Sequence, residues 1–199
     1  MKKIPVCMLL GCMLALGAGV SSEAAEQETR ILTDANGREV ELHQEIQRAV
    51  VSNRYNLEII RAIGAIDQVE AIDSLAYTNE AFWPEFTADD VYGKGTRDLD
   101  YEKIISYNPD VFIVLPGQYS DEIAEKLGDY DIPVFVLNCA SGQTVEEYNG
   151  QIELCADIFG KEEGAQKVID FCSLIRNEVE DRLKDMPEDD RVNVYLEYY

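Results

Sequence analysis

The sequence is poor in the residues and motifs on which most metal and hydrolytic sites depend. His43 is the only histidine among 199 residues, which excludes a histidine-rich zinc or manganese site. It follows a predicted hairpin, where a lone histidine is more often an edge residue than a ligand. The chain also lacks the Gly-x-Ser-x-Gly elbow, His-Glu-x-x-His, the Gly-x-x-x-x-Gly-Lys phosphate loop and Gly-x-Gly-x-x-Gly. Carboxylates are plentiful, but no pattern pairs two of them across a cleft. We therefore expect no enzymatic activity, no metal site and no cofactor.

Positively charged residues are also scarce. The chain carries 17 lysines and arginines against 39 aspartates and glutamates, a formal net charge of −22. Such a balance repels nucleic acid and anionic membranes, so nucleic acid is excluded as a partner. Most acidic residues fall on the faces of predicted helices, where they favour solubility. An anionic ligand would need a local basic group to hold it.

The first 24 residues have the pattern of a secretory signal peptide. Lys2 and Lys3 precede an apolar run over residues 4–20, and small residues follow, with cleavage after Ala24. The run is interrupted by glycines and is shorter than the ~20 residues that a membrane anchor needs. Residues 9–12 (LLGC) also resemble a lipoprotein cleavage box, which would attach lipid to Cys12. That alternative leaves a very short apolar core, so we favour export to the periplasm or the outer face of the cytoplasmic membrane without a lipid anchor.

Cleavage would leave three cysteines, Cys139, Cys155 and Cys172. An odd number in an exported protein leaves at least one thiol unpaired. If the helices on either side of Gly160 run antiparallel, Cys155 lies about two turns from Cys172, too far for a disulfide. We therefore predict buried free thiols.

The middle of the chain alternates between short apolar strands and helices. A hairpin is predicted first, with strands at 30–34 and 38–42 joined through Asn36-Gly37. The strand patterns that follow are 49–51, 69–72, 110–115 and 133–137, and the helical patterns are 57–63, 101–107, 120–130 and 144–159. The last two strands are apolar without alternation, which is typical of strands buried on both faces. This order predicts an α/β fold in which helices cover both faces of a parallel sheet.

One long helix is predicted over residues 161–186, between Gly160 and Pro187. At 1.5 Å per residue it would span ~39 Å, longer than most globular domains need. Residues 191–199 then resemble a strand. We interpret the chain as a lobe over 25–160, a connecting helix over 161–187, and the start of a truncated second lobe over 188–199. The helix has one apolar stripe, formed by Ala165, Val168, Ile169, Cys172, Ile175, Val179, Leu183 and Met186.

Binding is the function that the loops favour, because ligands of open parallel sheets lie beyond the carboxyl ends of the strands. The loops expected there are rich in aromatic rings and hydrogen-bond donors. Rings offer flat contact area, and Arg54 can pair with a carboxylate or phosphate through two parallel hydrogen bonds, which suits a bulky, oxygen-rich or chelated ligand. The candidate ligand-binding residues are Arg54, Tyr55, Asn56, Ser74, Tyr77, Gln118, Tyr119, Asn138 and Ser141.

Several short stretches together resemble the helical-backbone class of substrate-binding proteins, which deliver iron–siderophore, cobalamin or haem to ABC importers. They are 33–42 (TDANGREVEL), 48–51 (RAVV), 57–64 (LEIIRAIG), 101–113 (YEKIISYNPDVFI) and 131–134 (DIPV), followed by the long helix. The resemblance implies two lobes joined by one rigid helix, with ligand in the cleft between them. It also implies docking on a permease through acidic residues, for which Glu85, Asp89 and Asp90 are the candidates in this lobe.

The leading hypothesis is therefore an exported receptor that captures a metal chelate, first of all a ferric siderophore, and delivers it to an ABC permease. Cobalamin, haem or an oxyanion such as molybdate are the alternatives within the same family. An exported single-domain hydrolase is the alternative from a different class, and an interaction module without a small ligand is the third.

Overall fold

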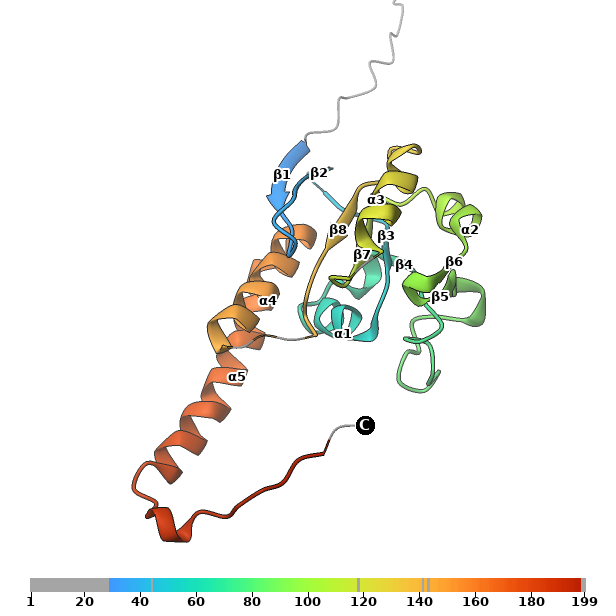
Figure 1. Ribbon diagram of the computed structural model, residues 1–199. Coiled ribbons are helices and arrows are strands. Elements are labelled where there is room, and N and C mark those ends of the chain that lie inside the picture. The colour runs from blue at the N-terminus through green and yellow to red at the C-terminus, as the bar shows by residue number, and fades with distance from the viewer. Residues whose placement is uncertain (1–28, 44, 118, 141, 143, 198–199) are drawn as a thin grey trace, which may run out of the picture.

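The computed structural model describes residues 29–197 except 44, 118, 141 and 143. Its centre is a parallel sheet of four strands in the order β4-β3-β7-β8, shown in Figure 1. The strands are β3 (Ala49–Val51), β4 (Val69–Ile72), β7 (Val111–Val114) and β8 (Val134–Val136). Each lies within one residue of its predicted bounds.

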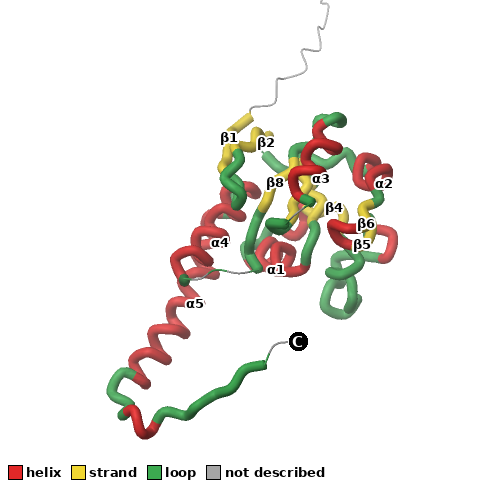
Figure 2. Tube along the Cα trace, in the orientation of Figure 1, coloured by secondary structure: helices red, strands yellow, loops and turns green. Residues whose placement is uncertain are grey.

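The sheet is buried on both faces, as the apolar strand patterns predict. In β3, Ala49 and Val51 belong to one buried cluster and Val50 to another, and Ile113 and Phe112 of β7 divide in the same way because neighbouring side chains point to opposite faces. Helices α1 (Arg54–Ala62) and α4 (Val145–Phe159) cover the first face. Helices α2 (Tyr101–Ser106) and α3 (Ser120–Gly128) cover the second. The predicted α/β fold class is confirmed (Figure 2).

The predicted hairpin is present as β1 (Thr29–Thr33) and β2 (Glu39–His43), which pair antiparallel. Of its two turn residues only Gly37 has a positive φ, 79°, so the glycine alone supplies the left-handed residue of the turn. The buried Asp34 carboxylate accepts hydrogen bonds from Arg38 Nε at 2.9 Å and Nη2 at 2.7 Å. The main-chain bond from Ala35 N to Val136 O, 2.8 Å long, joins this turn to β8.

Short elements complete the lobe. The two-residue strands β5 (Gly93–Lys94) and β6 (Asp98–Leu99) form a small hairpin beside β4. Single-turn 3-10 helices occur at Ile66–Gln68, Ala88–Asp90, Gly95–Arg97 and Glu188–Asp190. No helix among the described residues is both long and apolar enough to span a membrane. The predicted signal peptide and Cys12 lie outside the described residues.

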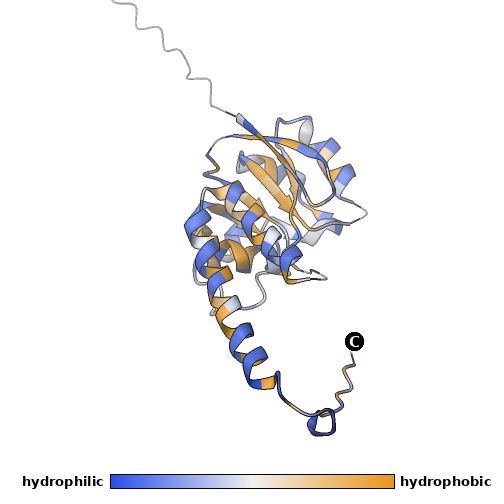
Figure 3. Ribbon diagram, turned by 90° about the vertical axis from the view of Figure 1, so that its left-hand side faces the viewer, coloured by the Kyte–Doolittle hydropathy of each residue, from blue (hydrophilic) through white to orange (hydrophobic). Residues whose placement is uncertain are grey.

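The long helix is continuous, as predicted, and forms α5 (Glu162–Leu183). It runs antiparallel to α4 and extends past the lobe on the side where the strands end (Figure 1). Only the first half of its predicted apolar stripe is covered: Ala165 is buried, and Val168 and Ile169 pack against the core. In the outer half apolar and charged residues are both exposed (Figure 3), and the exposed apolar residues include Phe171, Leu174, Ile175, Val179 and Leu183.

Two predictions about the carboxyl-terminal part are wrong. Residues 191–197 form no strand and are exposed, because a strand needs a neighbouring backbone to pair with and none of the described strands lies beside them. Cys172 is exposed, whereas Cys139 and Cys155 are buried free thiols as predicted. The reason is that Cys172 lies near the middle of α5, where the helix leaves the lobe and most of its side chains are exposed.

Candidate functional site

The carboxyl ends of three neighbouring strands enclose a pocket. Ser52 follows β3, Asp73 follows β4, and residues 115–117 follow β7, and all of them line a cavity of about 220 Å³. Asn53, Thr96, Tyr119 and Ser120 complete its polar lining. The pocket therefore lies at the edge of the sheet where the sequence predicts a ligand.

The buried Asp73 carboxylate ties two of these loops together. It is 1 % exposed and accepts hydrogen bonds from Ser52 Oγ at 3.1 Å, Asn53 N at 2.7 Å and Ala76 N at 2.7 Å. Three donors stabilise a buried carboxylate that would otherwise be costly to desolvate. The pocket thus has a rigid floor whose charge is already compensated.

Helix α1 begins at this edge, three residues earlier than predicted. Asn53, at φ 88°, is its N-cap, and its side-chain oxygen accepts a hydrogen bond from Tyr55 N at 2.9 Å. Arg54 and Tyr55 therefore lie in the first turn of a helix rather than in a loop. Arg54 Nη2 donates to Tyr55 Oη at 3.0 Å, and the guanidinium carbon lies 4.9 Å from the centre of the ring. The exposed arginine is thus oriented by its neighbour beside the pocket, although neither residue lines it.

Asn56 has a different position from the one predicted. Its side chain is fully buried, with Nδ2 donating to Leu137 O at 2.9 Å and Oδ1 accepting from Cys139 N at 3.0 Å. The amide therefore holds the chain after β8 against α1. It does not face the cleft, because helix α1 turns this position towards the sheet.

The other predicted binding residues divide between neighbouring surfaces. Tyr119 lines the pocket, and Asn138, in the loop after β8, donates its main-chain N–H to Gln151 Oε1 at 2.9 Å. Tyr77 packs against the first core, and partial burial, followed by the charges of Glu80 and Asp90, raises its pKa. Gln118 and Ser141 lie outside the described residues.

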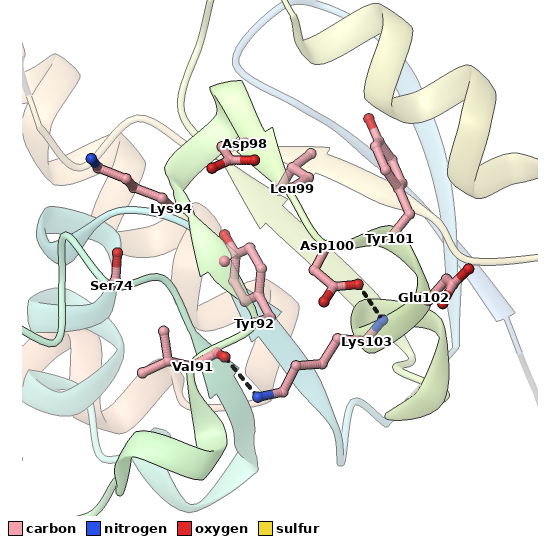
Figure 4. Close-up of a pocket in the computed structure, with 11 residues that line it drawn as sticks. Ser74, Val91, Tyr92, Lys94, Asp98, Leu99, Asp100, Tyr101, Glu102 and Lys103 are labelled. Carbon is pink, nitrogen blue, oxygen red and sulfur yellow. Dashed lines mark hydrogen bonds between the residues drawn. The ribbon is translucent and has the colours of Figure 1, made fainter.

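Ser74 lines a broader groove of about 730 Å³ between the β5–β6 hairpin and α2 (Figure 4). Lys103 is held there by two hydrogen bonds. Its main-chain N–H donates to Asp100 Oδ1 at 2.9 Å, and its side-chain Nζ donates to Val91 O at 2.8 Å. The ring of Tyr92 lies between these residues and Ser74 (Figure 4). The groove lies along the edge of the sheet, apart from the pocket that the three strand ends enclose.

The hydroxyl of Tyr92 is buried and forms no hydrogen bond of standard geometry among the described residues, although the Ser52 hydroxyl lies close enough to oppose the rise of its pKa. Burial, and then the nearby charge of Asp73, raise the pKa of this phenol well above 10.0. Because an unpaired buried hydroxyl costs free energy, we expect Tyr92→Phe to leave the free energy of unfolding unchanged or to raise it by up to about 1 kcal/mol. Urea unfolding measures this difference, and a loss of stability larger than about 1 kcal/mol would show that the hydroxyl has a partner.

A second, smaller pocket of about 210 Å³ adjoins the first and shares Thr96 and Tyr119 with it. It adds two cationic residues, Arg97 and Lys126, and two carboxylates, Asp98 and Glu122. Lys126 Nζ pairs with Glu122 Oε1 at 2.7 Å and lies 5.1 Å from the centre of the Tyr101 ring. Arg97 is exposed at the entrance. The two pockets together form one polar surface to which the second pocket adds both cationic and acidic groups.

Sequence analysis missed several of these residues. Ser52, Asn53 and Asp73 each lie one or two positions after a strand. Their place directly after a predicted strand is therefore the signal that could have identified them. Thr96 and Arg97 come from the short helix after β5, more than 20 residues beyond β4. No local pattern connects them with the strand ends, and only the folded chain does.

The three candidate docking carboxylates are not equally available. Glu85 forms an ion pair with Arg61, whose guanidinium lies 3.9 Å from the centre of the Trp83 ring. Asp90 accepts hydrogen bonds from Thr87 N at 2.7 Å and Thr87 Oγ1 at 2.9 Å. Asp89 is exposed. Two of the three therefore stabilise their own loop.

Comparison with known proteins identifies relatives of the chain. The profile of a family described as periplasmic binding protein matches residues 50–199. The molybdate-binding protein MolA of Haemophilus influenzae is 25% identical over 95% of this chain and 58% of its own length. Its molybdate-bound structure has a TM-score of 0.69 at 24% identity, covering 82% of this chain and 56% of that one.

Other solved structures share the fold. A periplasmic solute-binding protein of Veillonella parvula has a TM-score of 0.66 at 20% identity, covering 81% of this chain and 50% of that one. The petrobactin-binding protein YclQ of Bacillus subtilis has a TM-score of 0.61 at 18% identity, covering 79% and 53%. The chain thus spans little more than half the length of these proteins. Because the profile matches most of its residues, the chain belongs to the periplasmic binding protein family, and its fold is that of the helical-backbone class.

Proposed function

We propose that this chain forms one wall of the ligand cleft of an extracytoplasmic binding protein, which captures a compact anion and delivers it to an ABC importer. The observation that carries the proposal is the pocket of about 220 Å³ at the strand ends, which is lined by hydroxyl groups. Its one buried carboxylate, Asp73, is compensated by three donors. The pocket can therefore accept negative charge in spite of the acidic character of the whole chain.

A tetrahedral oxyanion such as molybdate is the first candidate. A chain of net charge −22 repels anions at long range, so an anion must be held by donors at hydrogen-bonding distance. Thr96 and Tyr119 bring hydroxyl groups to a pocket of suitable size, whereas the Ser52 hydroxyl already donates to Asp73. The similarity to MolA, which extends over 95% of this chain, supports the same ligand class.

A metal chelate, first of all a ferric siderophore, is the second candidate. The observation that favours it is the exposed Arg54 with its ring neighbour Tyr55, beside two connected pockets. A larger anionic ligand could contact both pockets and this arginine together. The fold shared with the petrobactin-binding protein agrees with that reading. Cobalamin and haem, which the resemblance also implies, are further candidates among the larger ligands.

The proposed mechanism is capture and delivery without bond making. The uninterrupted α5 would restrict opening of the cleft to a small rocking motion, because a continuous helix has no hinge residue to absorb a large rotation. The partner is an ABC permease, and Asp89 is the exposed carboxylate that this lobe offers for docking.

Titration followed by two-dimensional NMR tests the ligand class and detects weak binding. Sodium molybdate should shift the amide signals of Ser52, Thr96 and Tyr119, and sodium sulfate and sodium chloride serve as matched salts. Shifts caused by a ferric siderophore, cobalamin or haem, but not by molybdate, would favour the second candidate. If no compound shifts these signals, the pocket is not the ligand site.

Replacing Arg54 by alanine should weaken binding of an anionic metal chelate about tenfold, because a charge-assisted hydrogen bond is lost. Isothermal titration or the NMR titration measures the change. Arg176→Ala on α5 removes the same charge far from the pocket and should leave the affinity unchanged. Equal affinity of the Arg54 variant and the unmodified chain would contradict the role assigned to Arg54.

A further inference from the structure

Two buried thiols meet where the chain leaving β8 crosses α4. Cys139 Sγ donates a hydrogen bond to Gln151 O at 3.9 Å, in the turn of α4 that precedes Cys155. Helical side chains lean towards the amino end of their helix, so the Cys155 side chain is directed at this same turn. Both residues belong to one buried cluster, with exposures of 4 % and 0 %. The two thiols are close enough for the Cys139 side chain to raise the pKa of the Cys155 thiol.

The backbone around Cys139 is held from two sides. Its N–H donates to Asn56 Oδ1 at 3.0 Å, and the preceding Asn138 N–H donates to Gln151 Oε1 at 2.9 Å. One bond leads to α1 and the other to α4. These bonds fix the position of Cys139 beside α4, the helix that carries Cys155, whereas Cys172 is exposed on α5.

We propose that Cys139 and Cys155 are a modification site, a dithiol that a small disulfide oxidises to an intramolecular disulfide. The Cys139 thiolate attacks one sulfur of the oxidant, for example oxidised glutathione, and the first glutathione thiolate leaves. The Cys155 thiolate then attacks the Cys139 sulfur and releases the second glutathione. The protein loses two protons and two electrons, and the oxidant gains them as two thiols. This proposal does not depend on the ligand.

Burial determines when the reaction occurs. It raises the pKa of the Cys155 thiol well above 9.0, with the neighbouring Cys139 thiol as the second cause. The nucleophilic thiolate is therefore rare in the folded protein. Oxidation should be slow in the folded chain and fast while the chain folds, when both sulfurs meet solvent.

The disulfide would stabilise the loop that leads into α4. It would close a loop over residues 139–155. This loop begins just after β8, where the candidate binding edge ends. A loop of this length should raise Tm by about 5–10 °C relative to the reduced protein. Cys172 would remain the unpaired thiol of the odd set.

Peptide mapping tests the proposal directly. The full chain is reduced, refolded in a glutathione redox buffer, treated with iodoacetamide under denaturing conditions and digested with trypsin. Cys139 and Cys155 share the tryptic peptide 127–161, while Cys172 lies on peptide 168–176. We expect peptide 127–161 without alkyl groups and two hydrogen atoms lighter than its reduced form, and peptide 168–176 alkylated.

Two variants complete the test. Cys155→Ala should abolish both the change in peptide mass and the difference in Tm between oxidised and reduced protein. Cys172→Ala should affect neither. Alkylation of both thiols in peptide 127–161 after refolding would overturn the proposal, as would a disulfide that links this peptide to peptide 168–176. If Cys155→Ala does not fold, the peptide map of the unmodified chain alone shows whether the Cys139–Cys155 disulfide forms.

Discussion

Gly164→Ala is expected to lower the free energy of unfolding by about 3 kcal/mol, because it forces α5 away from α1. A Cβ atom at this position would lie 2.0 Å from Ile63 O and 2.8 Å from Ile63 C. Both are main-chain atoms at the end of α1, so no side-chain rotation can relieve the overlap. The first turn of the long helix would have to move, and with it the direction of α5 relative to the cleft.

Gly150→Ala is the matched control. Gly150 lies inside α4, and nothing lies within 4 Å of the Cβ atom that the substitution would add. The same change should therefore stabilise the protein by about 1 kcal/mol, because alanine loses less backbone entropy in a helix than glycine. Urea unfolding of both variants should give changes of opposite sign. Equal changes in stability would contradict the close packing of α5 on α1.

Asn56→Leu is expected to cost about 3 kcal/mol, although the sequence favours this asparagine as a ligand residue. Its removal leaves Leu137 O and Cys139 N without the amide that now pairs with them. Each unpaired buried group costs ~1–3 kcal/mol, and the apolar replacement recovers part of that cost. Thermal or urea unfolding measures the loss.

The same substitution at Asn177, which is exposed on α5, should change stability by less than about 0.5 kcal/mol. A variant at Asn56 that keeps its stability but loses the ligand would restore the role predicted from the sequence. A variant that is destabilised supports the position seen in the structure.

Local signals explain why so much of the fold could be predicted. The strands at 49–51 and 69–72 match their predicted bounds. Short, mainly apolar runs between turn residues are typical of strands in a buried sheet. Thr144 and Glu147 form a capping box at the start of α4, a pattern that lies within four residues of the chain. Gly160, at φ 65°, ends α4, as expected of a residue that adopts the left-handed conformation without strain.

The binding edge could be predicted only in part. The loops that directly follow the strands lie at one edge of the sheet, as predicted, and Tyr119 lines the pocket there. Within those loops the direction of each side chain depends on where the next helix begins. Because Asn53 caps α1 directly after β3, Asn56 lies on the buried face of the helix and Arg54 on the exposed one.

The sequence by itself determined the alternation of strands and helices, the two-sided burial of the sheet and the continuity of α5, because these follow from side-chain period, capping and turn chemistry within a few residues. Only the tertiary structure decided that Thr96 joins Ser52 and Asp73 in one pocket, that Cys139 lies against the turn of α4 that precedes Cys155, and that residues 191–197 form no strand. Each of these depends on a partner far away in the chain. A local pattern carries no information about such a partner until the backbone brings the two together.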